Sequence, residues 1–131
     1  VIMNTEYFVV PSFFTASQVL EKLRETAPEA ETIYYIYVGD QDEHLLGVFS
    51  LRQLVLAQPD AAVIDFMEKR VVTVDLTDSQ EDCAQVISKY NLLAVPVVDE
   101  QRHIHGIVTA DDALDKIIPT AWKKRLPRFY Q

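Results

Sequence analysis

Apolar residues recur at helical spacing over two stretches of the chain. After Thr15 the apolar positions before Pro28, which ends the run, are Val19, Leu20, Leu23 and Ala27. Thr15 and Gln18 have the spacing of a capping box, in which both side chains hydrogen-bond free N–H groups at a helix start. The pattern therefore predicts a helix that begins after Thr15 and ends before Pro28.

The second helical stretch places Cys83, Ile87 and Tyr90 on one face. Either of two pairs could cap its start. These pairs are Thr77 with Gln80, and Asp78 with Glu81.

Two apolar runs, 33–38 and 92–98, lack the alternation of a half-exposed strand. Such runs are typical of strands that are covered on both faces. Tyr35 and Tyr37 share one face of the first run, so one could border a cleft while the other fills the core. Gly47 and Gly106 each precede a short β-rich run, where a turn favours an unhindered backbone.

The chain contains an internal repeat. Residues 47–54 match residues 106–113 at an offset of 59, residues 35–38 match 95–98, and residues 7–11 match 71–75. Each copy has the order strand, helix, strand, turn, strand, helix, which is an α/β fold with right-handed crossovers. A copy of about 50 residues is too small to bury its sheet well. We therefore expect two βαββα repeats, about 7–57 and 63–118, packed pseudo-symmetrically as one module.

Composition supports one compact module, because 49% of the 131 residues are hydrophobic. No apolar stretch approaches the roughly 20 residues that cross a bilayer, so we expect no membrane segment in this chain. Cys83 is the single cysteine, which excludes an internal disulfide and fits a reducing, cytoplasmic location. We expect it to pack in the core.

Charge is distributed unevenly, with a formal net charge of −8. Four of the twelve basic residues lie in the segment 119–131, which we expect to be a basic linker or tail. The remaining acidic body should repel nucleic acid and attract cations or a basic partner.

The repeated motif resembles that of the CBS domain. Residues 95–99, Val-Pro-Val-Val-Asp, precede Gly-Ile-Val-Thr-Ala-Asp-Asp at 106–112, and the first copy has Gly-Val-Phe-Ser-Leu-Arg at 47–52. The resemblance covers roughly residues 7–118. Its details are most similar to the cytosolic CBS pair of MgtE-type magnesium transporters and related soluble proteins. The family implies a tandem pair that binds adenosine-containing ligands in clefts between the repeats.

The resemblance implies a nucleotide site in the second repeat. Thr109 would place a hydroxyl at a positive helix end, where a phosphate is favoured. Asp112 could accept two hydrogen bonds from ribose hydroxyls. Val95 and Pro96 would line the adenine side, together with Thr73.

The first repeat departs from this pattern. Ser50 matches Thr109, but Gln53 stands where a carboxylate is expected. Arg52 would suit phosphate oxygens. We therefore expect one competent cleft, in the second repeat, with a weaker or inactive one in the first.

Acidic residues at the start of the last helix suggest a second ligand, Mg²⁺. Asp112 and Asp115 match carboxylates that help to hold magnesium in the transporters, although acids also favour a first helical turn for its dipole alone. His44, His103 and His105 are expected to be solvated turn residues, because a zinc site would need a further ligand.

These features favour a regulatory module that binds ATP, ADP or AMP and controls an attached transporter or cytosolic domain. By resemblance it would be a homodimer through its helices, with Phe66, Met67 and residues 51–57 on that surface. The alternatives are a structural dimerisation module with inactive clefts and a magnesium sensor. An enzyme is not expected, because no catalytic motif or phosphate-cradling glycine loop is present.

Overall fold

The computed structural model describes residues 1–26 and 33–117, and for 114–117 the backbone only. The described elements are β1 (Val9–Pro11), α1 (Ala16–Thr26), β2 (Tyr35–Gly39), β3 (Leu45–Ser50), α2 (Leu51–Leu56), α3 (Val63–Phe66), β4 (Val74–Asp75), α4 (Gln80–Tyr90), β5 (Ala94–Val98), β6 (Ile104–Thr109) and α5 (Ala110–Ile117). They form the predicted βαββα order twice, and α3 is an additional turn of helix. The predicted segment 119–131 lies outside the described residues.

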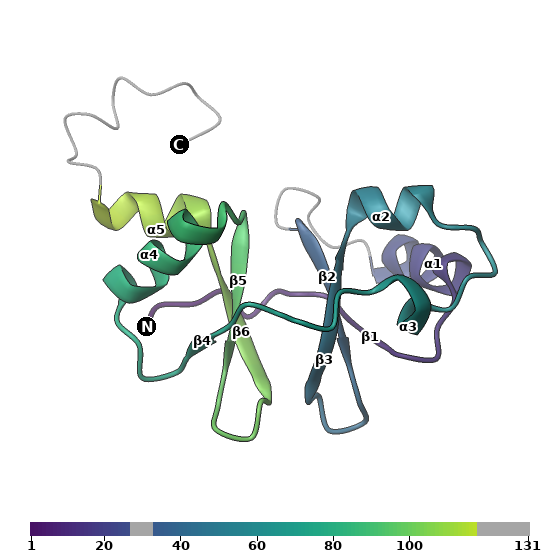
Figure 1. The fold of residues 1–131 in the computed structure, drawn as a ribbon, viewed down its shortest axis with the longest axis horizontal. Coiled ribbons are helices and arrows are strands. Elements are labelled where there is room, and N and C mark those ends of the chain that lie inside the picture. Colours follow the sequence, from purple (N-terminus) through teal and green to yellow (C-terminus); the bar gives the residue numbers. More distant parts are fainter. Residues whose placement is uncertain (27–32, 118–131) are drawn as a thin grey trace.

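The strands form two three-stranded sheets that face each other, with helices on the outer sides (Figure 1). In each sheet the first strand is parallel to the central one, and the central strand pairs with the third as a hairpin. The registers correspond: Val38 opposes Gly47 in the first sheet, and Val97 opposes Gly106 in the second. The predicted α/β pair of repeats is confirmed.

Apolar side chains form three clusters that follow this layering. One cluster lies between the first sheet and its helices and includes Val10, Val19 and Phe49. A second, around Cys83 and Val95, lies between the second sheet and its helices. The third joins the inner faces of the two sheets and consists of Tyr37, Leu45, Ala94, Val98, Ile104 and Ile107. The central strands are therefore covered on both faces, as the continuous apolar runs predicted.

Each repeat receives a short segment from outside its own sequence copy. Asn4 pairs with Ile107 at the free edge of β6, with backbone N···O distances of 2.8 and 2.9 Å. Glu68 pairs in the same way with Val48 at the free edge of β3, at 2.8 and 3.0 Å. The chain thus crosses between the two halves twice, before β1 and before β4 (Figure 1). The crossing segments therefore cover the β3 edge of the first sheet and the β6 edge of the second.

The helix starts follow from local hydrogen bonding. Thr15 and Gln18 form the predicted capping box of α1, with their backbone N–H groups bonded to each other's side-chain oxygens. At α4 the two predicted pairs are wrong, because Ser79 and Asp82 form the capping box instead. Thr77 is engaged earlier, since its hydroxyl donates to the Asp75 carboxylate at 2.9 Å.

Phe66 and Met67, which we predicted to lie on a homodimer surface, are partly buried in the single chain. Both pack against the first core cluster, and the Phe66 ring meets Phe49 edge-on at 5.1 Å between centroids. Val63 is fully buried in the same cluster. The segment that follows residue 62 therefore packs with the first repeat, although the sequence assigns it to the second.

Candidate functional site

A cavity of about 160 Å³ lies between the two sheets. Its lining combines both repeats with the segment that connects them: Tyr35, Tyr37, Val48, Glu68, Arg70, Val71, Val72, Leu92, Ala94 and Pro96. Most of this surface is apolar, and the charged side chains belong to Glu68 and Arg70. Such a mainly apolar hollow with a few polar groups is typical of a small-molecule site.

Strand alternation decides which residues of β2 and β5 reach the cavity. Tyr35 and Tyr37 both line it, as do Ala94 and Pro96. Val95 points to the opposite face, where it is fully buried among the second repeat's helices. Of the two predicted adenine-side residues, Pro96 therefore lines this cavity and Val95 does not.

The two tyrosine hydroxyls have different surroundings. The Tyr35 hydroxyl accepts a hydrogen bond from the backbone N–H of Leu93 at 3.2 Å. Tyr37 is 2% exposed, and its hydroxyl has no hydrogen-bond partner among the described residues. Burial raises the pKa of Tyr37 above its ordinary value, so the phenol stays protonated.

The charged part of the lining comes from the connecting segment. Glu68 is fixed by its backbone pairing with Val48, and its carboxylate accepts the N–H of Arg70 at 2.9 Å. Thr73 follows two lining valines but does not line the cavity itself. Glu68 and Arg70 were not predicted as site residues from the sequence, because they lie in a short polar stretch outside the repeated motif.

The start of α5 adjoins the cavity. Thr109 is opposite Ala94 in the sheet register, and Ala94 is a lining residue. The Thr109 hydroxyl accepts the N–H of Asp112 at 3.2 Å, which is half of a capping box. The Asp112 side chain is exposed and makes no hydrogen bond or ion pair with any described residue. Its carboxylate oxygens are therefore available to a ligand.

The start of α2 has the corresponding position in the first repeat, with Ser50 opposite Tyr35. Here the capping box is complete: Ser50 accepts the N–H of Gln53 at 3.1 Å, and Gln53 accepts the N–H of Ser50 at 2.8 Å. The Gln53 side chain is thus already engaged, whereas that of Asp112 is not. Arg52 is exposed beside it.

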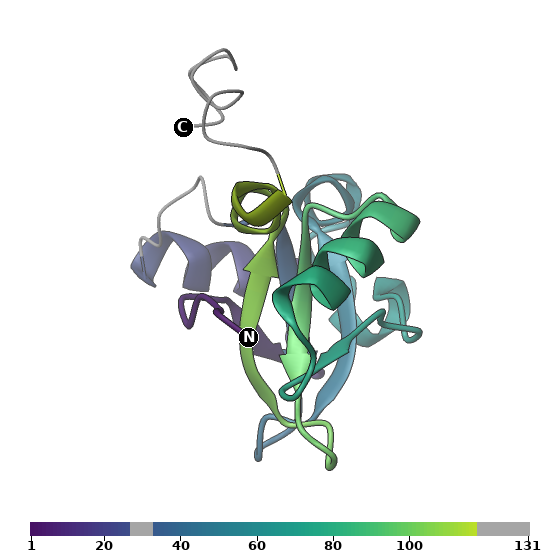
Figure 2. The same cartoon turned by 90° about the vertical axis from the view of Figure 1, so that its left-hand side faces the viewer.

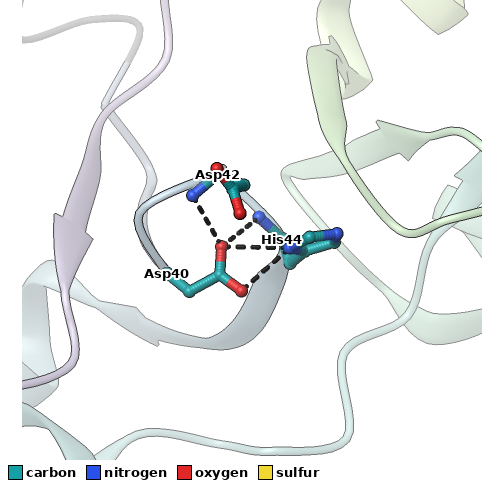
Figure 3. Close-up of side chains that lie close together, drawn as sticks. All are labelled: Asp40, Asp42 and His44. Carbon is teal, nitrogen blue, oxygen red and sulfur yellow. Dashed lines mark hydrogen bonds and ion pairs between the residues drawn. The ribbon is translucent and has the colours of Figure 1, made fainter.

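The predicted magnesium pair is only partly described, because the side chain of Asp115 lies outside the described residues. A different cluster, Asp40, Asp42 and His44, brings three possible metal ligands within 4.8 Å of one another (Figure 3). Asp40 is already engaged there, since it accepts the N–H groups of Asp42 and His44 and the His44 ring N–H at 2.8 Å. These bonds account for the cluster as a stabilised turn.

The second repeat contains the same turn, in which Asp99 takes the place of Asp40. Asp99 accepts the N–H groups of Gln101 and His103 at 2.9 Å, so glutamine replaces the middle aspartate. The tips of the two hairpins meet at one end of the molecule (Figure 2), where the rings of His44 and His103 stack at 4.1 Å between centroids. These histidines join the repeats and are more than solvated turn residues.

Lowering the pH should reduce the stability of the hairpin between β5 and β6, because Asp99 becomes protonated. The hydrogen bond from the His105 ring, 2.9 Å long, and those from the backbone hold the pKa of Asp99 below its ordinary value of 3.8. The resulting stabilisation should be present above pH 3.8 and be lost as the pH falls below it. Asp99→Asn should therefore be less stable than wild type at pH 5, with a smaller difference at pH 3.

Urea unfolding at both pH values measures this difference. Glu100→Gln, which changes the exposed neighbouring carboxylate, is the matched control. A deficit of Asp99→Asn that is equal at the two pH values would contradict the assignment.

Together these features define the class of the protein: a pseudo-symmetric pair of βαββα repeats around a shared, mainly apolar cavity. The chain belongs to the CBS domain family, whose model matches residues 1–60 and 63–119. It is MgtE-like within that family. It is 46% identical to the magnesium transporter MgtE of Enterococcus faecalis over 116 residues, which are 88% of this chain and 26% of the transporter.

Further similar proteins are also MgtE transporters. The MgtE of Thermus thermophilus is 46% identical over 114 residues, 87% of this chain and 25% of that protein. Among solved structures, the cytosolic domain of the Mg²⁺ channel MgtE in complex with ATP has a TM-score of 0.84 and 45% identity, covering 88% of this chain and 46% of that one. The chain thus spans about a quarter of these curated transporters. No described helix is sufficiently long and apolar to span a bilayer.

Proposed function

We propose that the chain is a regulatory module that binds an adenine nucleotide in the cavity between its repeats. The observation that carries the proposal is the free carboxylate of Asp112 at the start of α5, next to a cavity-lining strand. In three other helices the corresponding side chain completes a capping box. At α5 it is left to accept hydrogen bonds from ribose hydroxyls, while the helix end favours phosphate.

The base would lie in the apolar cavity, against Pro96 and the connecting segment near Thr73. Thr109 would lie close to the phosphates. The first repeat would bind a nucleotide weakly, because Gln53 is occupied by Ser50. Arg52 is free in the structure described and could assist a phosphate from that side.

The likeness to an ATP-bound MgtE cytosolic domain supports ATP among the candidates ATP, ADP and AMP. We propose that the chain is a cytoplasmic part of a larger protein that controls magnesium transport, with no catalysis of its own. Inosine-5'-monophosphate dehydrogenase of Nitrosopumilus maritimus is also a relative, at 29% identity over 84 residues, so related sequences occur within enzymes. The acidic surface of this chain supports a role without nucleic acid.

Two further features of the proposal concern metal and assembly. Asp112, with Asp115, would bind Mg²⁺ together with oxygens from an attached domain. A homodimer would form through the helices, because α2 exposes apolar side chains such as Val55 at 73% and Leu56 at 70%. A module with inactive clefts that only dimerises is the competing function.

Thermal unfolding with ATP, ADP or AMP, each with and without Mg²⁺, tests the proposal. A nucleotide at 100 times its dissociation constant adds about 2.7 kcal/mol, which raises the midpoint by several degrees. Asp112→Ala should lose most of that rise, whereas Gln53→Ala should keep it while lowering the unliganded midpoint through its lost cap.

Sedimentation of the same samples measures the oligomeric state of the chain. A dimer with no response to any nucleotide would replace the proposal with the dimerisation module. Stabilisation by Mg²⁺ alone would favour the magnesium sensor. An equal rise for wild type and Asp112→Ala would place the nucleotide elsewhere.

A further inference from the structure

The hydroxyl of Tyr37 is a buried polar group without a partner. Within the part of the chain that the structure describes, it is the buried side-chain atom left without a hydrogen bond. Buried polar groups in folded proteins are nearly always paired, because removing them from water without a partner is costly. An exception of this kind calls for a physical reason.

The surroundings of Tyr37 offer little that could pair with the hydroxyl. Its cluster neighbours on the facing sheet are the apolar residues Ala94, Val98 and Ile107. Neighbouring tyrosines are already engaged: Tyr35 accepts the Leu93 N–H, and Tyr7 donates to the Ile104 carbonyl at 3.3 Å. Tyr37 is one of the residues that line the cavity, so a ligand that fills the cavity is the nearest candidate partner for the buried hydroxyl.

We infer that Tyr37 is a specificity-determining residue, whose hydroxyl hydrogen-bonds the polar edge of the base when a nucleotide fills the cavity. This inference rests on the proposed function, since it names the group that recognises the base in the same site. A phenol both donates and accepts, so it can pair with a ring nitrogen or with an exocyclic amino group. The apolar lining of the cavity would otherwise hold any flat ring of similar size.

In this arrangement different residues of the chain recognise the two ends of the nucleotide. Asp112 and the start of α5 meet the sugar and phosphate, which all nucleotides share. Tyr37 meets the base, in which they differ. A site that offers a buried hydrogen-bonding group discriminates strongly against ligands that leave it unpaired.

The test is Tyr37→Phe, which removes one oxygen atom and keeps the ring. Affinity for ATP, ADP and AMP, and for GTP as a nucleotide with a different base, is measured by calorimetry, and the unfolding midpoint of the unliganded variant is measured beside it. We expect the tightest of these nucleotides to bind at least tenfold more weakly to Tyr37→Phe. The unliganded midpoint should stay equal or rise, because an unpaired buried hydroxyl has been removed.

Tyr7→Phe is the matched control, because it removes a hydroxyl that already has a partner and lies outside the cavity lining. It should lower the unliganded midpoint slightly and leave the affinity unchanged. Equal affinity of wild type and Tyr37→Phe would overturn this inference and leave the proposed function standing. A clear fall in the unliganded midpoint of Tyr37→Phe would also overturn it, by showing that the hydroxyl is paired without ligand. If wild type binds no nucleotide, the proposed function fails, and this inference fails with it.

Discussion

Replacing Phe49 with alanine should lower the free energy of unfolding by about 3–5 kcal/mol. Phe49 is 1% exposed on β3, lies in the first core cluster and packs edge-on against Phe66. Its removal would leave a cavity between the first sheet and α3 that the rigid strand cannot close. Because domains of this size are stable by only about 5–15 kcal/mol, much of the total would be lost.

Urea unfolding followed by circular dichroism measures this loss. The matched control is Glu25→Ala on α1 of the same repeat, where the side chain is exposed and lies outside the proposed α2 dimer surface, so truncation should change stability by less than about 0.5 kcal/mol. A similar loss in both variants would contradict the packing described for Phe49.

Gly106→Val should have the second largest effect, a loss of about 1–3 kcal/mol or more from overpacking. A Cβ atom at Gly106 would meet the Asn4 carbonyl oxygen at 2.9 Å and the Met3 sulfur at 2.8 Å. The carbonyl cannot move freely, because Asn4 is paired with Ile107. The substitution should therefore push the crossing N-terminal segment away from the edge of β6.

Gly47 provides the comparison, since it occupies the equivalent place in the first repeat. A Cβ there would meet the flexible Met67 side chain at 2.5 Å, while the nearest backbone atom, the Glu68 oxygen, is at 3.1 Å. Gly106→Ala should consequently destabilise more than Gly47→Ala in the same urea measurement. The reverse order would show that the Met67 side chain is the more rigid obstacle.

The sequence was most informative where the same pattern occurred twice. The matched motifs around Gly47 and Gly106 predicted two equivalent hairpins, and Thr15 with Gln18 predicted the capping box of α1. Local hydrogen bonding limited this precision at α4, where three consecutive polar residues could each have capped. The structure selects Ser79, because Thr77 is bound to Asp75.

For a strand that is covered on both faces, it was harder to predict which side chains point toward the cavity. In an entirely apolar strand such as β5, nothing in the residue types distinguishes the side that meets a helix from the side that meets a cavity. Val95 and Pro96 were therefore assigned together, although they point in opposite directions. Glu68 and Arg70 reach the cavity only because the chain crosses from one repeat to the other, a long-range feature that no local pattern encodes.

Because the repeats exchange segments, we expect the pair of repeats to be the smallest part of the chain that folds by itself. Residues near Asn4 complete the edge of the second sheet, and residues near Glu68 complete that of the first. A first repeat cut at the boundary between the copies would lose Val63 from its hydrophobic core and would also present an unpaired strand edge to solvent. Such an edge favours association with another chain. Gene fusion or fission in this family is therefore expected to move both repeats together, with the residues before β1 included.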